Sequence, residues 1–554
     1  MGIHVDADIV LLGGNVLTVD PKNSRAESVA IKDGKFLWVG TTEEVKASIG
    51  RKTQVRDLKG MTLVPGFNEA HNHTLQFGHI LTGIVLASAR SIDEILDRVK
   101  ETAHQQREGD WIFGSGFDQS KLREKRLLTR WDLDKVSPGH PVSLKHTSMH
   151  VMVANSRALA LAGITKETPD PEGGEIGRDK ATGELTGILY EFPAMNLIEN
   201  RMPKPSHEDL IEALRRASEQ FVSEGITSAT DAGVGVLVDV PRQIAAYQDA
   251  VEREFLKVRH NLAIWSNVLF NYDRFEEEMK GLEWKLLGMG IRSGLGNQRL
   301  RIGPFKFVPD GALSTGTAVT YEPYGADPNH KTTGVFVIDP DKLTELASAV
   351  HGFGWQLMIH AIGDRTLDNA IFAIEKALRK RPKRDARPRL EHCVMLTRPM
   401  IERIERLGIL VILQPGFIWG LGDNYISQLG HERASKTKPF RTIIDHNVLM
   451  AFSSDRPVID GAPLLGIHAA INQKTMSGRD YAPDERISVE EALRCYTING
   501  AYTTFEENIK GSIEWGKLAD LVILAEDPTR VAHDRIKDIP VIATMVQGEF
   551  VYER

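Results

Sequence analysis

The stretch that decides the fold is Leu63-Val64-Pro65-Gly66-Phe67-Asn68-Glu69-Ala70-His71-Asn72-His73. It begins as an apolar run typical of a strand and ends with two histidines two positions apart. Because side chains alternate along a strand, His71 and His73 point to the same side while the strand stays extended. Two neutral imidazoles that converge on one point form half of a divalent-metal site. Taken alone, the pair is also compatible with two solvated or hydrogen-bonded histidines near a strand end.

The bulk composition indicates a globular enzyme with more than one structural unit. The chain has 554 residues, beyond the ~250–300 residues at which single hydrophobic cores stop growing. Hydrophobic residues make up 42% and charged residues 26%, both ordinary for a globular protein. The net charge of -7 provides no basic surface for nucleic acid or an anionic membrane, so we expect neither as a partner.

Cysteine usage and the N-terminal residues bear on the compartment. Cys393 and Cys495 are the two cysteines, which excludes a disulfide framework and suits a reducing cytoplasm. The first residues lack a basic segment followed by an apolar run, so we do not expect an export signal. No run approaches the ~18 apolar residues of a membrane span. We therefore expect a cytoplasmic protein.

Short strand-like runs at the two ends of the chain predict one composite β-sandwich. Residues 1–60 contain β-branched and apolar runs around the hairpin signal Lys32-Asp33-Gly34-Lys35. Residues 501–554 contain similar runs at 518–524 and 541–551. One sandwich assembled from both ends is the simplest interpretation, with the central region inserted into it.

The central region alternates strand-like runs with amphipathic helical stretches, a pattern typical of βα units and a parallel sheet. We expect helices at 341–353, 365–379 and 399–407. We expect barrel strands at 62–73, 227–231, 260–268, 300–310, 356–360, 389–393, 409–414 and 448–455. Eight such units predict an α/β fold with a closed (β/α)8 TIM-like barrel, whose catalytic residues lie at the carboxyl ends of its strands.

Residues 82–222 do not fit the barrel count. They contain strand-like runs of their own, at 111–114 and 141–144, and a Pro/Gly-rich stretch at 169–174. We interpret them as an inserted α+β subdomain that covers the barrel mouth. The metal-binding barrel then comprises residues 61–81 and 223–500.

Candidate metal ligands share one place in the predicted fold, at or near the carboxyl ends of the barrel strands. They are His71, His73, Lys306, His360, His392 and Asp455. Imidazole and carboxylate ligands suit zinc, with manganese, iron or cobalt as alternatives, so we expect one or two divalent ions per chain. Each residue taken singly also has a simpler explanation, such as a hydrogen-bonded histidine at a strand end or an aspartate that caps the next turn.

Several short motifs carry a family resemblance. They are Val64-Pro65-Gly66-Phe67 before the two histidines, Met358–Asp364, Arg389–His392, Ser453–Val458, Gly303–Ala312 and Gly516–Asp520. Together they resemble the amidohydrolase superfamily, and most closely its amidohydrolase-3 branch of YtcJ-like and N-substituted formamide deformylase-like proteins. The resemblance runs from Ala7 to Val551 and implies a metal-dependent hydrolase with a barrel and a composite sandwich. One departure is Glu69, where an aspartate is more usual, and its longer side chain makes a supporting role uncertain.

The resemblance also implies that Lys306 carries a carboxylated amine that bridges two metal ions. This modification needs a lysine desolvated enough to be partly neutral, which reacts with carbon dioxide and is trapped by the ions. The alternative is an ordinary ammonium paired with Asp310 or another carboxylate. With the bridge, two ions ~3.5–4 Å apart share the site. Without it, one ion is held by the other ligands.

A metal ion at this site lowers the pKa of a bound water from ~15.7 toward ~7, so hydroxide is available at neutral pH. We expect Asp455 to take the proton of that water and pass it to the leaving nitrogen, and also to bind the metal. His150 matches a motif of the same branch and is the second catalytic candidate, as a donor to the substrate carbonyl. The alternative for His150 is an ordinary polar residue of the insertion.

Three residues are candidates for binding a small-molecule substrate, namely Glu191, Asp364 and Trp419. The first two match motifs of the branch, but orienting a neighbouring group or capping a helix would explain them equally well. Trp419 follows the expected seventh strand together with Phe417 and Tyr425, and these aromatics could shape an apolar pocket. Core packing is the commoner use of such residues.

The predicted reaction is hydrolysis of a C–N bond other than a peptide bond, in an N-substituted formamide, N-acyl amine, imide or urea. Two alternatives stay open. A mononuclear deaminase of a heterocyclic amidine needs the histidines and Asp455 but not Lys306. A non-catalytic regulatory or binding homologue needs no activated water. No motif determines the oligomeric state, for which a homodimer is the working hypothesis.

Overall fold

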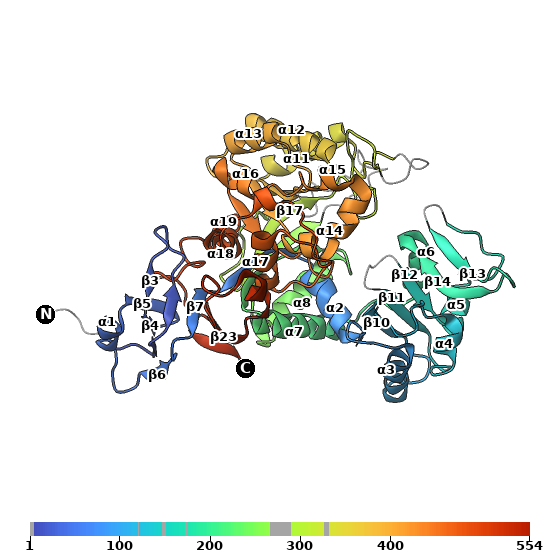
Figure 1. The fold of residues 1–554 in the computed structure, drawn as a ribbon, viewed down its shortest axis with the longest axis horizontal. Helices are drawn as coiled ribbons and strands as arrows, with labels where there is room; N and C mark the ends of the chain where they lie inside the picture. The colour runs from blue at the N-terminus through green and yellow to red at the C-terminus, as the bar shows by residue number, and fades with distance from the viewer. Residues whose placement is uncertain (1–4, 120, 147–150, 172–173, 266–289, 326–331) are drawn as a thin grey trace. The chain divides into compact units, whose positions relative to one another are not determined.

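The chain of the computed structural model divides into two units, Met1–Thr74 with Ser218–Arg554, and Leu75–Ala217 (Figure 1). The described residues are 5–119, 121–146, 151–171, 174–265, 290–325 and 332–554. The first unit contains a parallel barrel and a β-sandwich, and the second contains a mixed sheet with its own helices.

Eight parallel strands form the barrel sheet, and each is hydrogen-bonded to the next in sequence order. They are β8 (Phe67–Asn72), β15 (Ile226–Val234), β16 (Arg259–Trp265), β17 (Leu300–Phe307), β18 (Leu357–Ala361), β19 (Arg389–His392), β20 (Leu410–Leu413) and β21 (Met450–Phe452). Both faces of such a sheet are covered, which explains why β8, β15, β19 and β20 are buried along their whole length. The predicted fold class, a TIM-like barrel with additional domains, is confirmed.

The seam between the last strand and the first is joined just beyond the end of β21. There the Asp455 N–H donates to the His71 carbonyl at 2.9 Å, and the His73 N–H donates to the Arg456 carbonyl at 2.8 Å. The Glu69 carboxylate accepts from the Ser454 N–H at 2.9 and 3.1 Å, and from the His71 N–H at 3.2 Å. Glu69 therefore supports the seam, despite its departure from the more usual aspartate.

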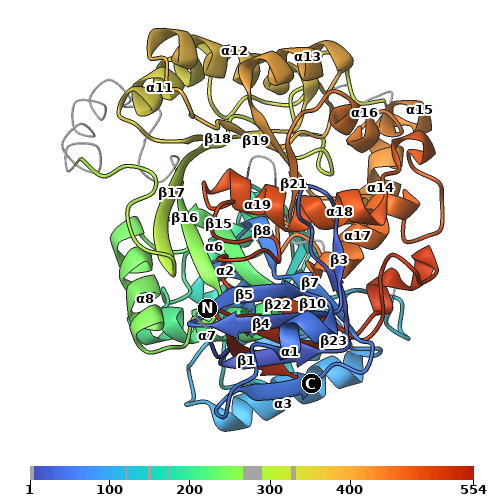
Figure 2. The same ribbon diagram turned by 90° about the vertical axis from the view of Figure 1, so that its left-hand side faces the viewer.

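Helices cover the outer side of the barrel sheet. Figure 2 shows α11, α12 and α13 along β18 and β19. The bounds are α7 (His207–Ser223), α8 (Val240–Glu252), α11 (Pro340–Gly352), α12 (Asp364–Lys380), α13 (Arg398–Leu407), α14 (Gly416–Leu429), α15 (His431–Ala434), α16 (Phe440–Asp445), α17 (Pro463–Asn472), α18 (Val489–Tyr496) and α19 (Ile498–Thr503). The three predicted helices at 341–353, 365–379 and 399–407 are confirmed to within one residue. Among the helices of the described ranges, none has the length and apolarity that a membrane crossing needs.

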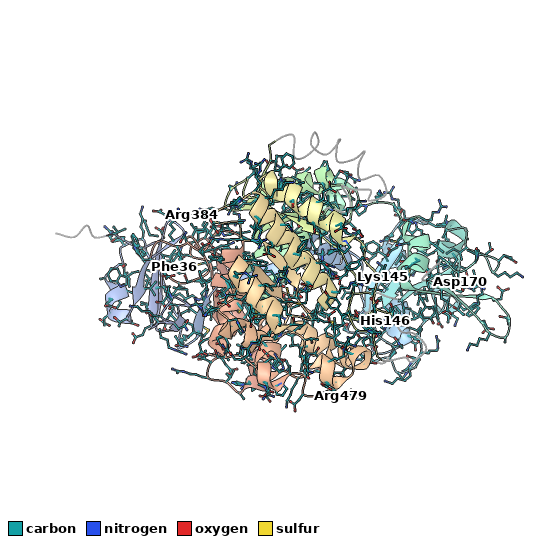
Figure 3. The ribbon with its side chains drawn as sticks, turned by 90° about the horizontal axis from the view of Figure 1, so that it is seen from above. Phe36, Lys145, His146, Asp170, Arg384 and Arg479 are labelled. Atoms are coloured by element: carbon teal, nitrogen blue, oxygen red, sulfur yellow. The ribbon has the colours of Figure 1, made fainter. Side chains whose placement is uncertain are left out.

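Two sheets from both ends of the chain form the sandwich. One has the order β5 (Lys35–Gly40), β4 (Ser28–Lys32), β1 (Ile9–Leu12) and β6 (Gln54–Asp57). The other has the order β24 (Glu549–Glu553), β23 (Val541–Val546), β22 (Leu521–Leu524), β7 (Thr62–Pro65), β2 (Asn15–Leu17) and β3 (Arg25–Ala26). Buried apolar side chains of both ends pack together between them, including Phe36, which is labelled in Figure 3. The predicted composite sandwich is confirmed.

The expected first barrel strand at 62–73 was wrong as a single element. It is two strands in two sheets: β7 pairs antiparallel with β22 in the sandwich, and β8 pairs with β15 in the barrel. Gly66 is the joint between them. A Cβ atom at Gly66 would lie 2.2 Å from Oγ1 of Thr227 on β15, so the joint approaches β15 more closely than a larger residue allows.

The unit Leu75–Ala217 is built around a six-stranded sheet. Its strands, in spatial order, are β13 (Glu175–Arg178), β14 (Leu185–Tyr190), β12 (Val151–Ala154), β11 (Val142–His146), β10 (Ile112–Phe117) and β9 (Ile84–Val85). Its helices in the described ranges include α2 (Thr74–Thr82), α3 (Ile92–Gln105), α4 (Arg130–Asp134), α5 (Ser156–Leu161) and α6 (Glu191–Glu199). The inserted segment is therefore an α+β unit, as the sequence predicts.

A buried ion pair joins the barrel to the sandwich. Arg259 at the start of β16 donates to Asp520 through Nε at 2.8 Å and Nη2 at 3.0 Å, and both side chains are 2% exposed. The same carboxylate accepts from the Gln547 N–H at 2.8 Å. Two parallel N–H donors give this contact a defined geometry as well as charge compensation.

Replacing Arg259 by methionine leaves the Asp520 carboxylate buried without its cation, which typically costs about 3–5 kcal/mol. We expect Arg259→Met to lower the unfolding midpoint strongly in thermal and urea denaturation. Arg259→Met combined with Asp520→Leu should recover part of the loss. Arg384→Met, at an exposed arginine labelled in Figure 3, is the control and should change stability by less than about 0.5 kcal/mol. A midpoint unchanged by Arg259→Met would contradict a structural role for the pair.

Candidate metal centre

His71 lies at the carboxyl end of β8 with its side chain fully buried. Its Nδ1 contacts the Glu391 carboxylate, which Arg389 holds through Nε at 2.8 Å and Nη2 at 3.2 Å. The guanidinium keeps Glu391 as an acceptor, so the His71 Nδ1–H donates and Nε2 carries the lone pair. Burial lowers the pKa of His71 well below its usual range, so the imidazole is neutral. The ring is therefore in the form that a metal ion requires.

Sequence reasoning missed the roles of Glu391 and Arg389. The signal was present, because charged residues alternate with apolar and imidazole side chains along the short strand β19. Every residue of that strand is buried, and a buried charge needs a partner. Only the tertiary structure reveals that the Arg389 side chain also donates from β19 to the Ala70 carbonyl of β8 at 2.8 Å.

His73 follows β8 directly and turns its Nε2 toward Asp455 Oδ1, 3.3 Å away. Its Nδ1 is buried and has no hydrogen-bond partner within the described residues. Gly233 backs this nitrogen closely, since a Cβ at that position would lie 2.4 Å from it. The Trp265 ring lies 5.8 Å from the imidazole between centroids. Packing, rather than a hydrogen bond, therefore sets the orientation of His73.

Asp455 lies three residues beyond β21 in a left-handed backbone conformation, with φ at 58°. Its Oδ1 lies 3.4 Å from His71 Nε2 and 3.3 Å from His73 Nε2, yet it is buried without a hydrogen-bond partner in the described part of the chain. Burial favours the neutral acid, but the His73 side chain 3.3 Å away and the charge of Lys306 outweigh it and lower the pKa of Asp455 to about 2. The carboxylate is therefore ionised at neutral pH.

Lys306 lies on β17, and its Nζ is 3.0 Å from His71 Nε2 and 4.8 Å from the centre of the Trp265 ring. Burial lowers the pKa of Lys306 to about 8. The alternative pairing with Asp310 is not formed, because that carboxylate accepts from the Gly363 and Val319 N–H groups, both at 3.1 Å. Lys306 thus meets the requirement of a desolvated, partly neutral amine.

His360 and His392 complete the cluster from β18 and β19. Their ring centroids are 4.5 Å apart, and His392 lies 4.8 Å from the His71 ring. The His360 Nε2–H donates to the Gly311 carbonyl at 3.0 Å, which leaves Nδ1 with its lone pair. Burial lowers the pKa of His392 well below its usual range, so this imidazole is also neutral.

The donor set fits a divalent cation. One nitrogen each of His71 and His73 and one oxygen of Asp455 all lie within 4.8 Å of one another, and all three residues are buried. A buried carboxylate beside two imidazole nitrogens is a polar cluster that a bound cation would stabilise. Neutral imidazole and carboxylate are the ligand types that zinc and similar ions prefer. The structure gathers all six predicted ligand residues in this one cluster.

The other predicted site residues have separate environments. His150 lies outside the described residues. Glu191 begins α6 of the unit Leu75–Ala217. Asp364 accepts from the N–H groups of Tyr321 at 2.9 Å and Arg365 at 2.8 Å, so it anchors a loop at the start of α12.

Trp419 lies on α14 and packs edge-on against the His468 ring at 5.1 Å between centroids. Trp419 therefore has a packing contact, the role that the sequence offered as the alternative to lining a substrate pocket. Its neighbours Phe417 and Tyr425 lie on the same helix and are buried.

Residues 54–552 match the amidohydrolase family. The chain belongs to this family. It is 32% identical to the putative amidohydrolase YtcJ of Bacillus subtilis, over 98% of this chain and 99% of that relative. It is 30% identical to the N-substituted formamide deformylase of Arthrobacter pascens, over 99% and 98% of the two chains. An uncharacterized metal-dependent hydrolase from Pyrococcus furiosus has a similar structure, with a TM-score of 0.73, 27% identity and coverage of 94% and 100%.

This amidohydrolase also buries a lysine that sequence reasoning missed. Lys438 is fully buried, and its Nζ has no hydrogen-bond partner in the described ranges. The Phe417 ring lies 5.0 Å from the ammonium nitrogen, measured to the ring centre. Burial lowers the pKa of Lys438 to about 7, although Cys393 and Asp455 attract its charge. No local pattern marks this lysine, since the nearby polar residues Ser435 and Lys436 are partly exposed and exposed.

The close packing of Gly233 against His73 generates a prediction. Gly233→Ala should force the imidazole of this amidohydrolase away from Asp455, because the β15 backbone is anchored by the Gly233 N–H, which donates to Asp231 at 2.9 Å. We expect metal content, measured by elemental analysis, to fall several-fold while the circular dichroism spectrum stays unchanged. Gly352→Ala places the same methyl group in open space and should keep full metal content. Equal metal content in the two variants would contradict the packing argument.

The buried amine of Lys438 generates a pH-dependent prediction. The unfolded chain holds this proton up to pH ~10.4, whereas the folded chain releases it near pH 7. The contribution of Lys438 to the free energy of unfolding therefore rises between pH 7 and pH 10 and is lowest below pH 7. Lys438→Met should be more stable than the wild type at pH 7, by on the order of a few kcal/mol at most, and the advantage should shrink toward pH 10.

Urea denaturation across that pH window measures the effect. Lys436→Met, at an exposed lysine of the same segment, is the matched control and should show no pH-dependent difference. A constant offset between Lys438→Met and the wild type would show that Lys438 does not titrate in the folded chain.

Proposed function

We propose that this amidohydrolase hydrolyses a C–N bond other than a peptide bond in a small amide-type substrate, such as an N-substituted formamide, N-acyl amine, imide or urea. The observation that carries the proposal is the convergence of His71 Nε2, His73 Nε2 and Asp455 Oδ1 in one buried cluster, with 3.4 and 3.3 Å from the two nitrogens to the oxygen. Near full-length similarity to an N-substituted formamide deformylase supports the choice of bond.

We assign His71, His73, His360, His392 and Asp455 to hold zinc or a similar divalent ion. When bound, such an ion lowers the pKa of a coordinated water and polarises a carbonyl group. The protein supplies the rest. Arg389 and Glu391 orient His71, Gly233 holds His73 in place, and the seam contacts position Asp455.

Asp455 has a second oxygen for proton transfer. Oδ1 faces the two histidines of β8, while Oδ2 lies on the side of His392, 3.8 Å from its Nδ1. Because the carboxylate is ionised at neutral pH, Oδ2 is available to accept a proton from the attacking water and to return it to the departing amine nitrogen. An amine leaves more readily once it is protonated, so this transfer assists C–N cleavage.

We further propose that Lys306 reacts with carbon dioxide, and that the resulting carbamate would help to hold a second ion. A new N–C bond forms at Nζ, one proton leaves the amine, and the product is a carbamate anion. The lowered pKa of Lys306 and its position beside His71 support this step. An uncharged amine is the reactive form, and burial of the site favours it.

Metal analysis combined with an activity panel tests the function. Purified wild type should contain at least one divalent ion and turn over at least one amide, formamide or urea, with release of the amine. A chelator should abolish the activity and zinc should restore it. We expect Asp455→Asn to lose roughly 10²–10⁴-fold in rate, the typical contribution of a general base, or more if the metal is also lost.

Lys306→Ala should lose one of two ions, whereas Lys436→Ala, at an exposed lysine, should lose none. Release of ammonia from a heterocyclic amidine, with unchanged metal content in Lys306→Ala, would support a mononuclear deaminase instead. No turnover of any member of the panel by metal-replete protein would favour a binding or regulatory role.

A further inference from the structure

His392 is backed by a row of buried polar side chains that crosses three strands of the barrel. Its Nδ1 lies 3.0 Å from Gln414 Oε1, just beyond β20. The Gln414 Nε2 donates to Ser453 Oγ at 3.0 Å, just beyond β21. The Ser453 hydroxyl lies 3.3 Å from the Leu413 carbonyl. All of these residues are buried, so water does not replace a missing partner.

The proton positions along this row are assigned by starting from the Leu413 carbonyl, at the end farthest from His392. The Ser453 hydroxyl donates to the Leu413 carbonyl, which also accepts from the Ser453 N–H at 3.0 Å. The hydroxyl oxygen is then left as the acceptor for the Gln414 amide N–H. This choice turns the carbonyl oxygen of Gln414 toward His392 and fixes which way the carboxamide is oriented. The imidazole must donate from Nδ1, and its Nε2 keeps the lone pair.

We propose that Gln414, held by Ser453, is a positioning residue for His392, which fixes the imidazole with its proton on Nδ1 and its Nε2 lone pair available to the metal. This inference rests on the proposed function, in which His392 is a metal ligand. A metal-binding histidine usually donates its other N–H to an acceptor of this kind, and removal of that acceptor typically weakens metal binding 10–100-fold.

The hydrogen-bond acceptor that orients His392 differs from the one that orients His71. Glu391 is a carboxylate compensated by Arg389, whereas Gln414 is a neutral amide compensated by a hydroxyl. A neutral acceptor raises the basicity of its imidazole less than a carboxylate does. His392 is therefore the weaker donor of the two, and its contribution to metal binding depends more on correct orientation.

Gln414→Met, Gln414→Glu and a matched control test the inference. Methionine keeps the volume but removes the acceptor. Glutamate keeps an acceptor oxygen, and Ser453 can turn its hydroxyl to donate to the second one. The control is Gln356→Met, at an equally buried glutamine that precedes β18 at the opposite end of the barrel strands. That carboxamide donates to the Arg387 and Thr503 carbonyls at 2.8 and 3.0 Å.

Zinc affinity is measured by competition with a chelator, and the cobalt-substituted proteins are compared by their visible absorption spectra. We expect Gln414→Met to weaken zinc binding roughly 10–100-fold and to change the cobalt spectrum. Gln414→Glu should restore both to near wild-type values. Gln356→Met should leave both unchanged, even if it lowers stability, because it does not contact the cluster.

Ser453→Ala keeps the inference testable if Gln414→Met does not fold. It allows the Gln414 carboxamide to flip by about 180°. Zinc binding should then be weaker than in the wild type but stronger than in Gln414→Met. Wild-type affinity and spectrum in both Gln414→Met and Ser453→Ala would overturn the inference alone, with the proposed function intact. If the wild type binds no divalent ion, or binds it equally well after His71→Ala, the proposed function and this inference both fall.

Discussion

The contact on which the structure depends is the junction between the last barrel strand and the first. There the backbone of His71 accepts from Asp455, and the backbone of His73 donates to Arg456. The same residues present the side chains that form the cluster. Closure of the barrel and assembly of the site are therefore one event, because neither histidine can meet Asp455 until the two strands lie side by side. Glu69 reinforces this junction from inside the barrel.

The need to compensate buried charges explains how the side chains of the site are arranged. Ionic groups at the carboxyl end of the barrel are out of water, so each one needs a partner or loses its charge. Glu391 has Arg389, Asp455 has the His73 side chain and the nearby Lys306, and Lys306 itself has a lowered pKa. This arrangement provides neutral imidazoles and an ionised carboxylate at the same pH, which is the combination that a hydrolytic metal centre needs.

The composite sandwich holds the two ends of the chain against the barrel. Its sheets combine β1 to β7 with β22 to β24, so both ends of the chain must meet to form it. Two features connect the sandwich to the site. Gly66 lets β7 lead directly into β8, and Arg259 links β16 to Asp520. Gly66 lies five residues before His71, so strain at this joint would reach the cluster directly.

The sequence by itself determined the element types, the eight-strand alternation, the composite sandwich and the six residues of the cluster. These follow from short-range periodicity and from residue types at strand ends, which each segment carries independently of the others. Only the tertiary structure decided how strand 62–73 divides, that Glu391 orients His71 across 320 positions of the chain, and that Gln414 and Ser453 support His392. It also decided that Lys438 is buried. Such pairings depend on which strands become neighbours and on how far water is excluded, and no local pattern encodes either.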